Sequence, residues 1–302
     1  MMSVRRVISG KLVAALLFIL TALSAPAPEA NRGKVLIVLS SADQLHLREG
    51  KTYRTGYYLG ELAIPLQKIV TAGFEPVFAN PDGNAATYDP SSDDKRLFSN
   101  DDNARLAAKK LIEHYEGIKH PRKLADIVRE GTHDYVGIFI PGGHAPMEDL
   151  VQDTNLGQIL MQFHQTGRPT GLICHGPAAL LSTLKNPKAF RRAITKGNLR
   201  RLAELTEGWP YAGYRMTVFS TEEEKAIEGA GNRLGGYVPF YVANALARAG
   251  AHVEHAAPWQ SKVVEDRELV TGQQPFSAEA FADAFVMKLS QAGVSARPAS
   301  PE

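Results

Sequence analysis

Short apolar runs rich in β-branched residues alternate with longer amphipathic segments from residue 34 onward, and this alternation constrains the fold most. It is typical of a mostly parallel sheet covered by helices, because parallel strands need long crossover connections that are usually helical. The sequence therefore predicts an α/β fold: a mostly parallel central sheet sandwiched by helices in a single domain. Hydrophobic residues make up 44% of the chain, which is enough for a substantial core.

The alternation also predicts where the elements lie. Strands are expected at residues 34–41, 75–80, 135–140, 169–174, 216–219 and 252–256, with a hairpin at 262–264 and 269–271. Helices are expected at residues 56–72, 103–116, 156–165, 177–184, 239–249 and 278–289. Two polar stretches, 81–100 and 185–208, interrupt the pattern and are interpreted as surface insertions. The domain is expected to span residues 31–292, followed by a polar tail at 293–302.

The first thirty residues have the pattern of a secretory signal peptide. Arg5, Arg6 and Lys11 precede the apolar run 12–23, and small residues and prolines follow it. This run is shorter than the roughly 20 apolar residues that a spanning helix needs. We therefore expect residues 1–30 to be cleaved rather than kept as a stable membrane anchor. The mature protein is expected to be periplasmic or secreted.

Composition excludes several classes of partner and site. The chain has 34 Lys plus Arg against 32 Asp plus Glu, a net charge of +2, which is too balanced for binding a phosphate backbone. Nucleic acid is therefore not an expected partner. Cys174 is the single cysteine, which excludes an internal disulfide and a multi-cysteine metal site. Dinucleotide, phosphate-loop and HExxH motifs are missing from the sequence, so neither a cofactor nor a metal is expected.

Cys174 ends a predicted strand and is followed by His175, Gly176 and Pro177. This order predicts a strand–turn–helix elbow, in which the central side chain projects above the edge of the sheet. A helix N-terminus at that point favours the thiolate, and the adjacent His175 could take or return a proton. The alternative from the local sequence alone is that Cys174 is a small core residue.

A second turn, Pro141-Gly142-Gly143-His144, follows the strand expected at 135–140. Paired glycines let backbone N–H groups approach a substrate oxygen, so this turn is a candidate oxyanion hole. The alternative is an ordinary strand-to-loop turn. Open α/β sheets bind ligands at the carboxyl ends of their strands, and we expect this turn and the cysteine elbow to open there.

Four segments resemble the ThiJ/PfpI superfamily of class I glutamine amidotransferase-like proteins: LICHGPAALL, DYVGIFIPGGHAPMEDL, GELAIPLQKIVTAGFEPVFANPDG and RELVTGQQPFSAEAF. The resemblance extends from about residue 34 to residue 289 and is strongest to the glyoxalase III and chaperone branch. It implies a flavodoxin-like fold, a small-molecule aldehyde substrate and no cofactor. It is also compatible with a homodimer.

The same resemblance assigns three of the four catalytic positions, Cys174, His175 and Glu61. In this branch a catalytic cysteine and histidine are adjacent, which maps onto Cys174 and His175. The helix glutamate of the family is followed four residues later by proline and twelve later by Gly-Phe, and Glu61 has this spacing. Without the resemblance, Glu61 would be interpreted as a solvated helix residue.

The remaining assignments also rest on the resemblance. The third triad member is an acid shortly after a strand, for which Glu224 is the best match and Glu223 the alternative. The backbone amides of Gly143 and His175 are expected to form the oxyanion hole. The chain departs from the branch in the length of segment 185–208 and at Ala145, where a glycine is common. Both departures could reshape the mouth of the pocket.

These assignments imply a glyoxalase III-like lyase. It would convert a 2-oxoaldehyde such as methylglyoxal to a 2-hydroxy acid such as lactate without glutathione, with a cysteine nucleophile. Alternatives within the superfamily are a stress chaperone, a deglycase or a cysteine hydrolase. A non-catalytic exported binding protein is a further alternative. A glutamine amidotransferase would require a His-x-Glu pair late in the chain, a form that His252 and Glu254 have.

Overall fold

The computed structural model describes residues 32–295. The predicted signal peptide and residues 296–302 of the predicted tail therefore lie outside the described residues. Within residues 32–295, helices that combine the length and the apolar character needed to cross a membrane are not found.

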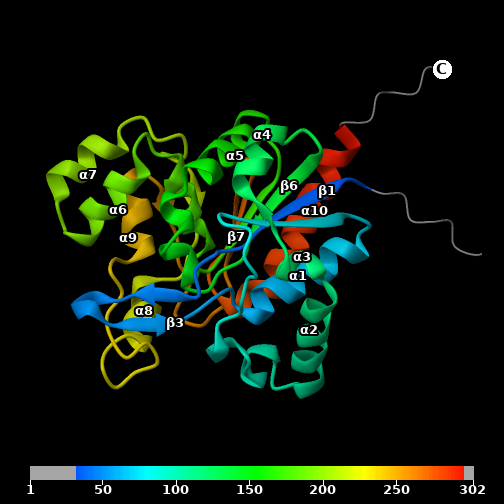
Figure 1. The fold of residues 1–302 in the computed structure, drawn as a ribbon, viewed down its shortest axis with the longest axis horizontal. Helices are drawn as coiled ribbons and strands as arrows, with labels where there is room; N and C mark the ends of the chain where they lie inside the picture. The colour runs from blue at the N-terminus through cyan, green and yellow to red at the C-terminus, as the bar shows by residue number, and fades with distance from the viewer. Residues whose placement is uncertain (1–31, 296–302) are drawn as a thin grey trace, which may run out of the picture. The chain divides into compact units, whose positions relative to one another are not determined.

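The central sheet contains seven strands in the order β10-β11-β7-β6-β1-β4-β5 (Figure 1). Their bounds are β1 Lys34–Val38, β4 Glu75–Asn80, β5 Arg122–Lys123, β6 Tyr135–Ile140, β7 Thr170–Ile173, β10 Val263–Asp266 and β11 Leu269–Gly272. Neighbouring strands pair in parallel, except β10 and β11, which are antiparallel. The predicted α/β fold with a mostly parallel sheet is confirmed.

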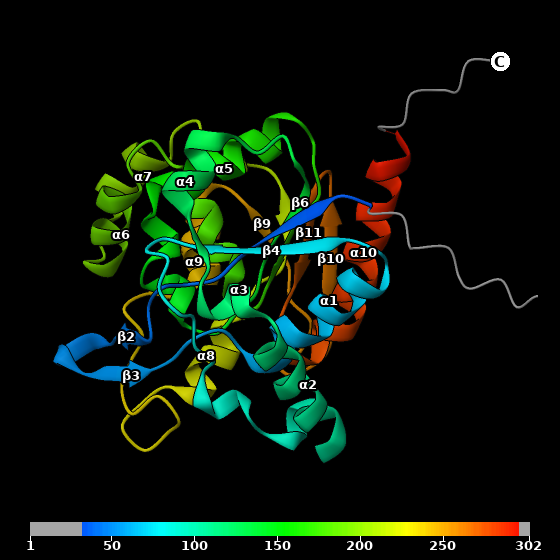
Figure 2. The ribbon, with the colours of Figure 1, turned by 45° about the vertical axis from the view of Figure 1, so that its right-hand side comes forward.

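Helices flank this sheet, with α1 and α10 on one face and α5 and α9 on the other (Figure 2). The α-helices are α1 Leu59–Thr71, α2 Asp102–His114, α3 Glu116–Lys119, α4 Leu124–Glu130, α5 Thr154–Gln165, α6 Pro187–Thr195, α7 Leu199–Thr206, α8 Thr221–Ile227, α9 Val242–Ala249 and α10 Ala278–Ser295. Short 3-10 helices are η1 Arg48–Gly50, η2 Pro90–Ser92, η3 Lys95–Phe98, η4 Ala145–Met147, η5 Leu150–Gln152, η6 Gly176–Thr183 and η7 Pro275–Ser277.

The inner strands are largely apolar because helices cover both faces of the sheet. All four residues of β7 are buried, as are four of the five residues of β1. Phe139 of β6 packs against Phe281 and Phe285 of α10, with ring centroids 5.6 and 6.0 Å apart. The core therefore holds the strands whose carboxyl ends carry the candidate site.

Two expected strands do not join the central sheet. The segments expected at 216–219 and 252–256 contribute only β8 (Arg215–Met216) and β9 (His252–Val253), which form a separate two-stranded parallel sheet. The reason is that the N–H groups of Arg215 and Thr217 donate to side-chain oxygens of Asp266 and Thr271, at 2.8 and 2.9 Å, instead of to strand carbonyls.

Other elements also differ from the sequence analysis. The helix expected at 177–184 is the 3-10 helix η6. The hairpin of β2 (Gln44–His46) and β3 (Thr52–Arg54), the edge strand β5 and the helix α4 were not predicted. These elements are short or lack clear periodicity, which is the signal on which the sequence analysis depends.

The segments 81–100 and 185–208, interpreted as surface insertions, take part in the packing of the domain. Ser92 is fully buried, and its hydroxyl accepts a hydrogen bond from the N–H of Leu59, at 2.9 Å. The first segment therefore fixes the start of α1. Helices α6 and α7 lie in the second segment and bury Phe190 and Leu202.

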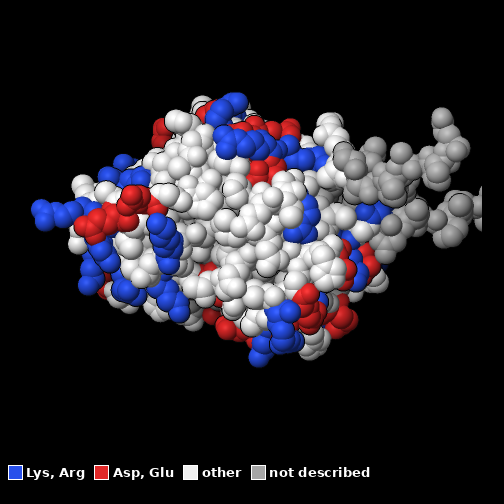
Figure 3. All heavy atoms as spheres, turned by 90° about the horizontal axis from the view of Figure 1, so that it is seen from above, with Lys and Arg blue, Asp and Glu red and all other residues white. Residues whose placement is uncertain are grey.

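Charged side chains of both signs occur around the margin of the face seen in Figure 3, and the centre of this face is uncharged. On this face a continuous basic stripe is therefore not seen. This pattern agrees with the small net charge of +2. The charge argument against a nucleic-acid partner stays a prediction.

Candidate active site

Cys174 follows β7 directly and adopts a left-handed backbone conformation, with φ of 59°. Such a conformation costs a non-glycine residue roughly 1–2 kcal/mol. It is held on both sides, because the N–H of Cys174 donates to Gly272 O at 2.8 Å and its carbonyl accepts from Phe219 N–H at 3.0 Å. The structure therefore has the elbow that the sequence predicts, followed by a 3-10 helix, and the backbone at Cys174 is strained.

The thiol lies beside a His–Glu pair. The Sγ of Cys174 is 3.3 Å from Nδ1 of His175, and Nε2 of His175 is 2.7 Å from Oε2 of Glu224. All three side chains are buried, with 3%, 1% and 2% exposure. The structure thus brings together the three residues that the resemblance assigned to a triad.

The run of glutamates at 222–224 separates into three environments in α8. Glu222 is exposed. Glu223 forms the capping box with Ser220 and also accepts from Trp259 N–H at 2.8 Å. Glu224 alone of the three contacts His175. Glu223 therefore has a structural role, and the structure favours Glu224 as the partner of the histidine.

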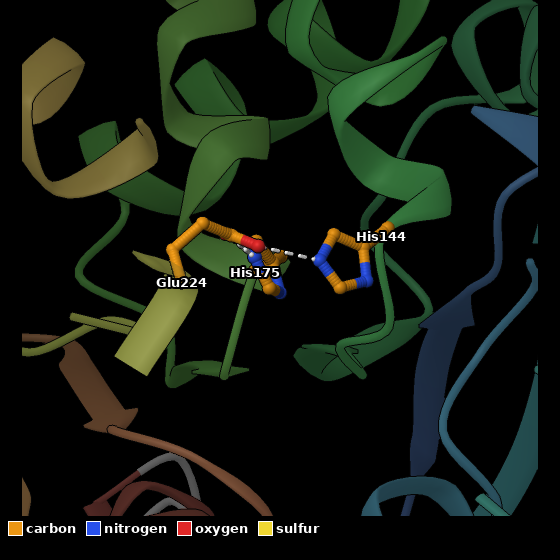
Figure 4. Close-up of side chains that lie close together, drawn as sticks. All are labelled: His144, His175 and Glu224. Carbon is orange, nitrogen blue, oxygen red and sulfur yellow. Dashed lines mark hydrogen bonds and ion pairs between the residues drawn. The ribbon is translucent and has the colours of Figure 1, made fainter. Parts of the chain in front are cut away.

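The sequence analysis missed a second histidine at this carboxylate. Nε2 of His144 is 2.8 Å from Oε1 of Glu224, so the carboxylate lies between two imidazoles (Figure 4). The two rings are 4.2 Å apart between centroids. The signal for this contact was present, because His144 and His175 follow the neighbouring strands β6 and β7 at the same edge of the sheet.

The charges of this cluster are strongly coupled. Burial by itself raises the pKa of Glu224, but the charges of His144 and His175 and their hydrogen bonds outweigh burial and hold that pKa well below its usual range. Burial and the charge of His144 lower the pKa of His175, against the opposing effect of Glu224. One carboxylate balances only one imidazolium in a buried site. Glu224 therefore stays ionised, and His175 in its neutral form can act as a base.

The same three residues form a possible set of metal ligands. One ligand atom each from His144, His175 and Glu224 lie within 4.8 Å of one another. Imidazole nitrogens and a carboxylate suit zinc and other transition metals. These atoms already form the two hydrogen bonds within the cluster. A metal ion would have to replace those bonds.

Glu61 lies in the first turn of α1 and is fully buried. Burial raises its pKa to about 8, although the thiol of Cys174 and the N–H of Gly142 oppose this rise. Gly142 lies against the side chains of both Cys174 and Glu61. A Cβ at this position would lie 2.4 Å from both Cys174 Cβ and Glu61 Oε2. The site therefore needs glycine at this position, and it holds a carboxyl group that is mostly protonated at neutral pH.

The pKa of the Cys174 thiol is raised well above its usual value. Burial is the main cause and the charge of Glu61 adds to it, while a hydrogen bond from the N–H of Gly143 opposes both. The expectation that the elbow favours the thiolate is therefore wrong. The elbow is buried and is followed by a 3-10 helix, so the positive end of an α-helix does not offset desolvation. A protonated Glu61 changes this balance, because it can donate a hydrogen bond to the sulfur.

The Gly143 turn places its amide near the sulfur. Gly143 has φ of 89°, and a Cβ there would lie 2.0 Å from Gly56 O, so only glycine fits. The amide of His175 belongs to the elbow itself. The use of these two amides as an oxyanion hole stays a prediction.

A small cavity of about 30 Å³ opens at the thiol. A space of this size holds a water or two, or a very small molecule. A larger neighbouring groove of about 510 Å³ shares three lining residues with it, Leu97, Pro275 and Phe276. The described lining residues of the small cavity are Tyr58, Leu97, Gly143, His144, Cys174, His175, Phe219, Arg233, Trp259, Pro275 and Phe276.

The histidine and glutamate that an amidotransferase would require, His252 and Glu254, do not lie at the cysteine. Glu254 forms ion pairs with Arg215 at 2.6 Å and Lys262 at 3.3 Å. His252 is exposed on β9. Neither residue lines the cavity at Cys174. The structure therefore disfavours an amidotransferase triad.

Comparison with known proteins agrees with the fold. Residues 55–189, which include the Glu61 helix and both turns, match the family model described as DJ-1/PfpI family. Over these residues the chain is similar to the DJ-1/PfpI family. This confirms the predicted resemblance to the ThiJ/PfpI superfamily. Among curated relatives is the protein/nucleic acid deglycase HchA of Staphylococcus aureus, 28% identical over 254 residues that cover 82% of this chain and 77% of the relative.

Solved structures show the same fold. The Francisella tularensis Rapid Encystment Protein 24 kDa has a TM-score of 0.62 and 26% identity, covering 85% of this chain and 99% of that protein. The glyoxalase III of Candida albicans has a TM-score of 0.59 and 23% identity, covering 85% and 98%. The chain is thus similar in sequence to a protein named as a deglycase, and its likeness to the glyoxalase III structure shows the fold.

Proposed function

We propose that the protein is a glyoxalase III-like enzyme that converts a 2-oxoaldehyde such as methylglyoxal to a 2-hydroxy acid without glutathione. The observation that carries the proposal is the pairing of a buried thiol with two differently charged carboxyl groups. Glu224 is held ionised behind His175, whereas Glu61 beside the sulfur is protonated near neutral pH. Two carboxyl groups whose pKa values are pushed apart are typical of acid–base catalysis.

In the first step His175 accepts the proton of Cys174, and the sulfur attacks the aldehyde carbon to form a hemithioacetal. Glu224 stabilises the imidazolium that results, as the acid of a triad does. The protonated Glu61 stabilises the thiolate before attack. The N–H of Gly143, which already lies against the sulfur, stabilises charge on the substrate oxygen.

In the second step the hydrogen on the former aldehyde carbon leaves as a proton, and the neighbouring ketone carbon gains a proton. Glu61 and His175 carry these protons through an enediol, which turns the hemithioacetal into a thioester. Water then cleaves the thioester, releasing the 2-hydroxy acid and the thiol. The aldehyde carbon is oxidised and the ketone carbon reduced, so an external electron carrier is not needed.

The experiment is to incubate the purified protein with methylglyoxal in the absence of glutathione and to measure lactate. We expect lactate from the wild type, and a loss of turnover of at least ~10²-fold in Glu61→Gln, the lower end for losing a general acid–base group. Thiol alkylation should persist in this variant, because its amide can still donate to the sulfur. Unchanged turnover in Glu61→Gln would leave Glu61 a purely structural residue.

A second candidate is a deglycase that acts on glycated side chains. Two observations favour it: the likeness to the Staphylococcus aureus deglycase, and the groove of about 510 Å³ that shares Leu97, Pro275 and Phe276 with the lining of the cavity. A glycated side chain would need such a groove for the rest of its protein. The test uses a pre-formed adduct of methylglyoxal on N-acetyl-arginine. Loss of methylglyoxal from this adduct that is faster with the enzyme than without it would support the deglycase. Lactate formed only from free methylglyoxal would favour the glyoxalase.

We propose in addition that the protein acts after export. The proposal rests on the signal-peptide pattern of residues 1–30. N-terminal sequencing of protein from the extracytoplasmic fraction should give a chain that begins between residues 25 and 31. An intact N-terminus in washed membranes would favour an anchor instead.

A further inference from the structure

Arg233 is the one permanently charged side chain among the described residues that line the cavity at Cys174. It lies in the loop between α8 and α9. Its Nη1 donates to the hydroxyl of Tyr58 at 2.9 Å, and its guanidinium carbon lies 5.9 Å from the centroid of the Tyr58 ring. A guanidinium carries several N–H donors. These contacts therefore place a positive charge at the cavity and leave donors for a further partner.

The acidic groups around this loop are bound elsewhere. Glu228 accepts hydrogen bonds from Val238 N–H and from the hydroxyl of Tyr241. Asp89 accepts from the hydroxyls of Tyr53 and Thr55, both at 3.0 Å. Within residues 32–295, Arg233 forms no ion pair with a carboxylate. Its charge is therefore balanced by solvent or by a ligand.

The cavity has a charged outer end and a reactive inner end. Arg233 is exposed, whereas Cys174 is 3% exposed. The other lining residues are largely apolar, with Leu97, Trp259 and Phe276 among them. Apolar walls exclude water and strengthen the attraction between unlike charges. A substrate that enters with its carbonyl toward the thiol presents its far end to the guanidinium.

We propose that Arg233, positioned by Tyr58, selects 2-oxoaldehydes that carry a carboxylate at the far end of a short carbon chain. The inference rests on the proposed glyoxalase III-like function and names its substrate class. A guanidinium and a carboxylate form charge-assisted hydrogen bonds that match in geometry. The carboxylate takes no part in the chemistry, so the product is a 2-hydroxy diacid formed by the same steps.

The first test compares two substrates that differ only in the terminal group, 4,5-dioxopentanoate and the neutral 2-oxopentanal. The wild type should have the higher kcat/KM for the carboxylate. In Arg233→Met the ratio of the two kcat/KM values should fall at least about tenfold, the lower end for losing a hydrogen bond to a charged group. Arg200→Met, which removes an exposed arginine of α7, is the matched control. A ratio unchanged in Arg233→Met overturns the proposal.

The second test does not depend on turnover. The second test uses the alkylation rate of Cys174 by anionic iodoacetate divided by its rate with neutral iodoacetamide. This ratio depends on the charge of the reagent and cancels effects on the thiol itself. Arg233→Met should lower this ratio at least about threefold, and Arg233→Lys should retain most of it. If neither aldehyde is turned over, a lowered ratio means that the proposed function fails while anion selection stands. If neither aldehyde is turned over and the ratio in Arg233→Met equals that of the wild type, both anion selection and the proposed function are overturned.

Discussion

Replacing Glu61 with Gln should change how the stability of the protein depends on pH. In the folded protein the pKa of Glu61 is raised from the ordinary 4.5 to about 8 because the side chain is fully buried. Between these two pH values the folded protein holds a proton that the unfolded chain has released. The contribution of Glu61 to stability is therefore fully present below about pH 4.5 and is lost as the pH rises through about 8.

The size of the effect follows from the same two pKa values. At about 1.4 kcal/mol per pKa unit, the rise from 4.5 to about 8 corresponds to at most about 5 kcal/mol. Gln stays uncharged at every pH, so the variant does not suffer this loss. The buried amide donors of Gln cost about 1–3 kcal/mol if they stay unpaired, but this cost is the same at every pH. Relative to the wild type, Glu61→Gln should therefore gain several kcal/mol across this range.

The assay is urea unfolding of both proteins at several pH values from about 4 to 9, with free energies extrapolated to water. Taking the difference between the proteins cancels the other titrating groups. The control is Glu222→Gln, which makes the same chemical change at an exposed position of α8. If the difference for Glu61→Gln is constant from about pH 4.5 to 8, the reasoning about burial of Glu61 is refuted.

Three further substitutions test the site. Cys174→Ser should abolish lactate formation while the unfolding midpoint stays close to that of the wild type, and residual turnover would exclude the covalent mechanism. Glu224→Gln should lower turnover far more than Glu222→Gln, because only Glu224 contacts His175. Equal effects of the two substitutions in a kinetic assay would mean that the contact of Glu224 with His175 does not matter for turnover. Gly142→Ala should destabilise the fold by about 1–3 kcal/mol and lower turnover, because its Cβ would overlap the Cys174 and Glu61 side chains. A variant with wild-type stability in urea unfolding and full activity would contradict this.

Periodicity was sufficient to predict the inner sheet, because β1, β4, β6 and β7 are apolar runs long enough to distinguish from loops. It failed for the segments 216–219 and 252–256, which contribute only the two-residue strands β8 and β9. Whether such a segment joins the central sheet depends on which group accepts each backbone N–H. The N–H of Thr217, for example, donates to the side chain of Thr271. Such pairing is set by tertiary contacts and is not visible in local sequence.

In the candidate site too, some features could be predicted from local sequence and others could not. The two turns that hold Cys174 and Gly143 have local signatures, so their meeting at one edge of the sheet could be predicted. The burial of Glu61 and the choice of Glu224 over Glu223 came only from resemblance, because a glutamate on a helix has no sequence signal for burial. His144 and Arg233 were missed, since their roles depend on contacts with residues far away in the chain.

The central claim is that the thiol of Cys174 performs the chemistry, and the single cysteine of the chain allows a direct titration. The measurement is stepwise alkylation with iodoacetamide, with the modified fraction of Cys174 determined by peptide mass spectrometry and lactate formation from methylglyoxal determined on the same samples. The account predicts that activity falls in proportion to the alkylated fraction and reaches zero at full modification, and that methylglyoxal slows the alkylation. Lactate formation that persists in fully alkylated protein would contradict it.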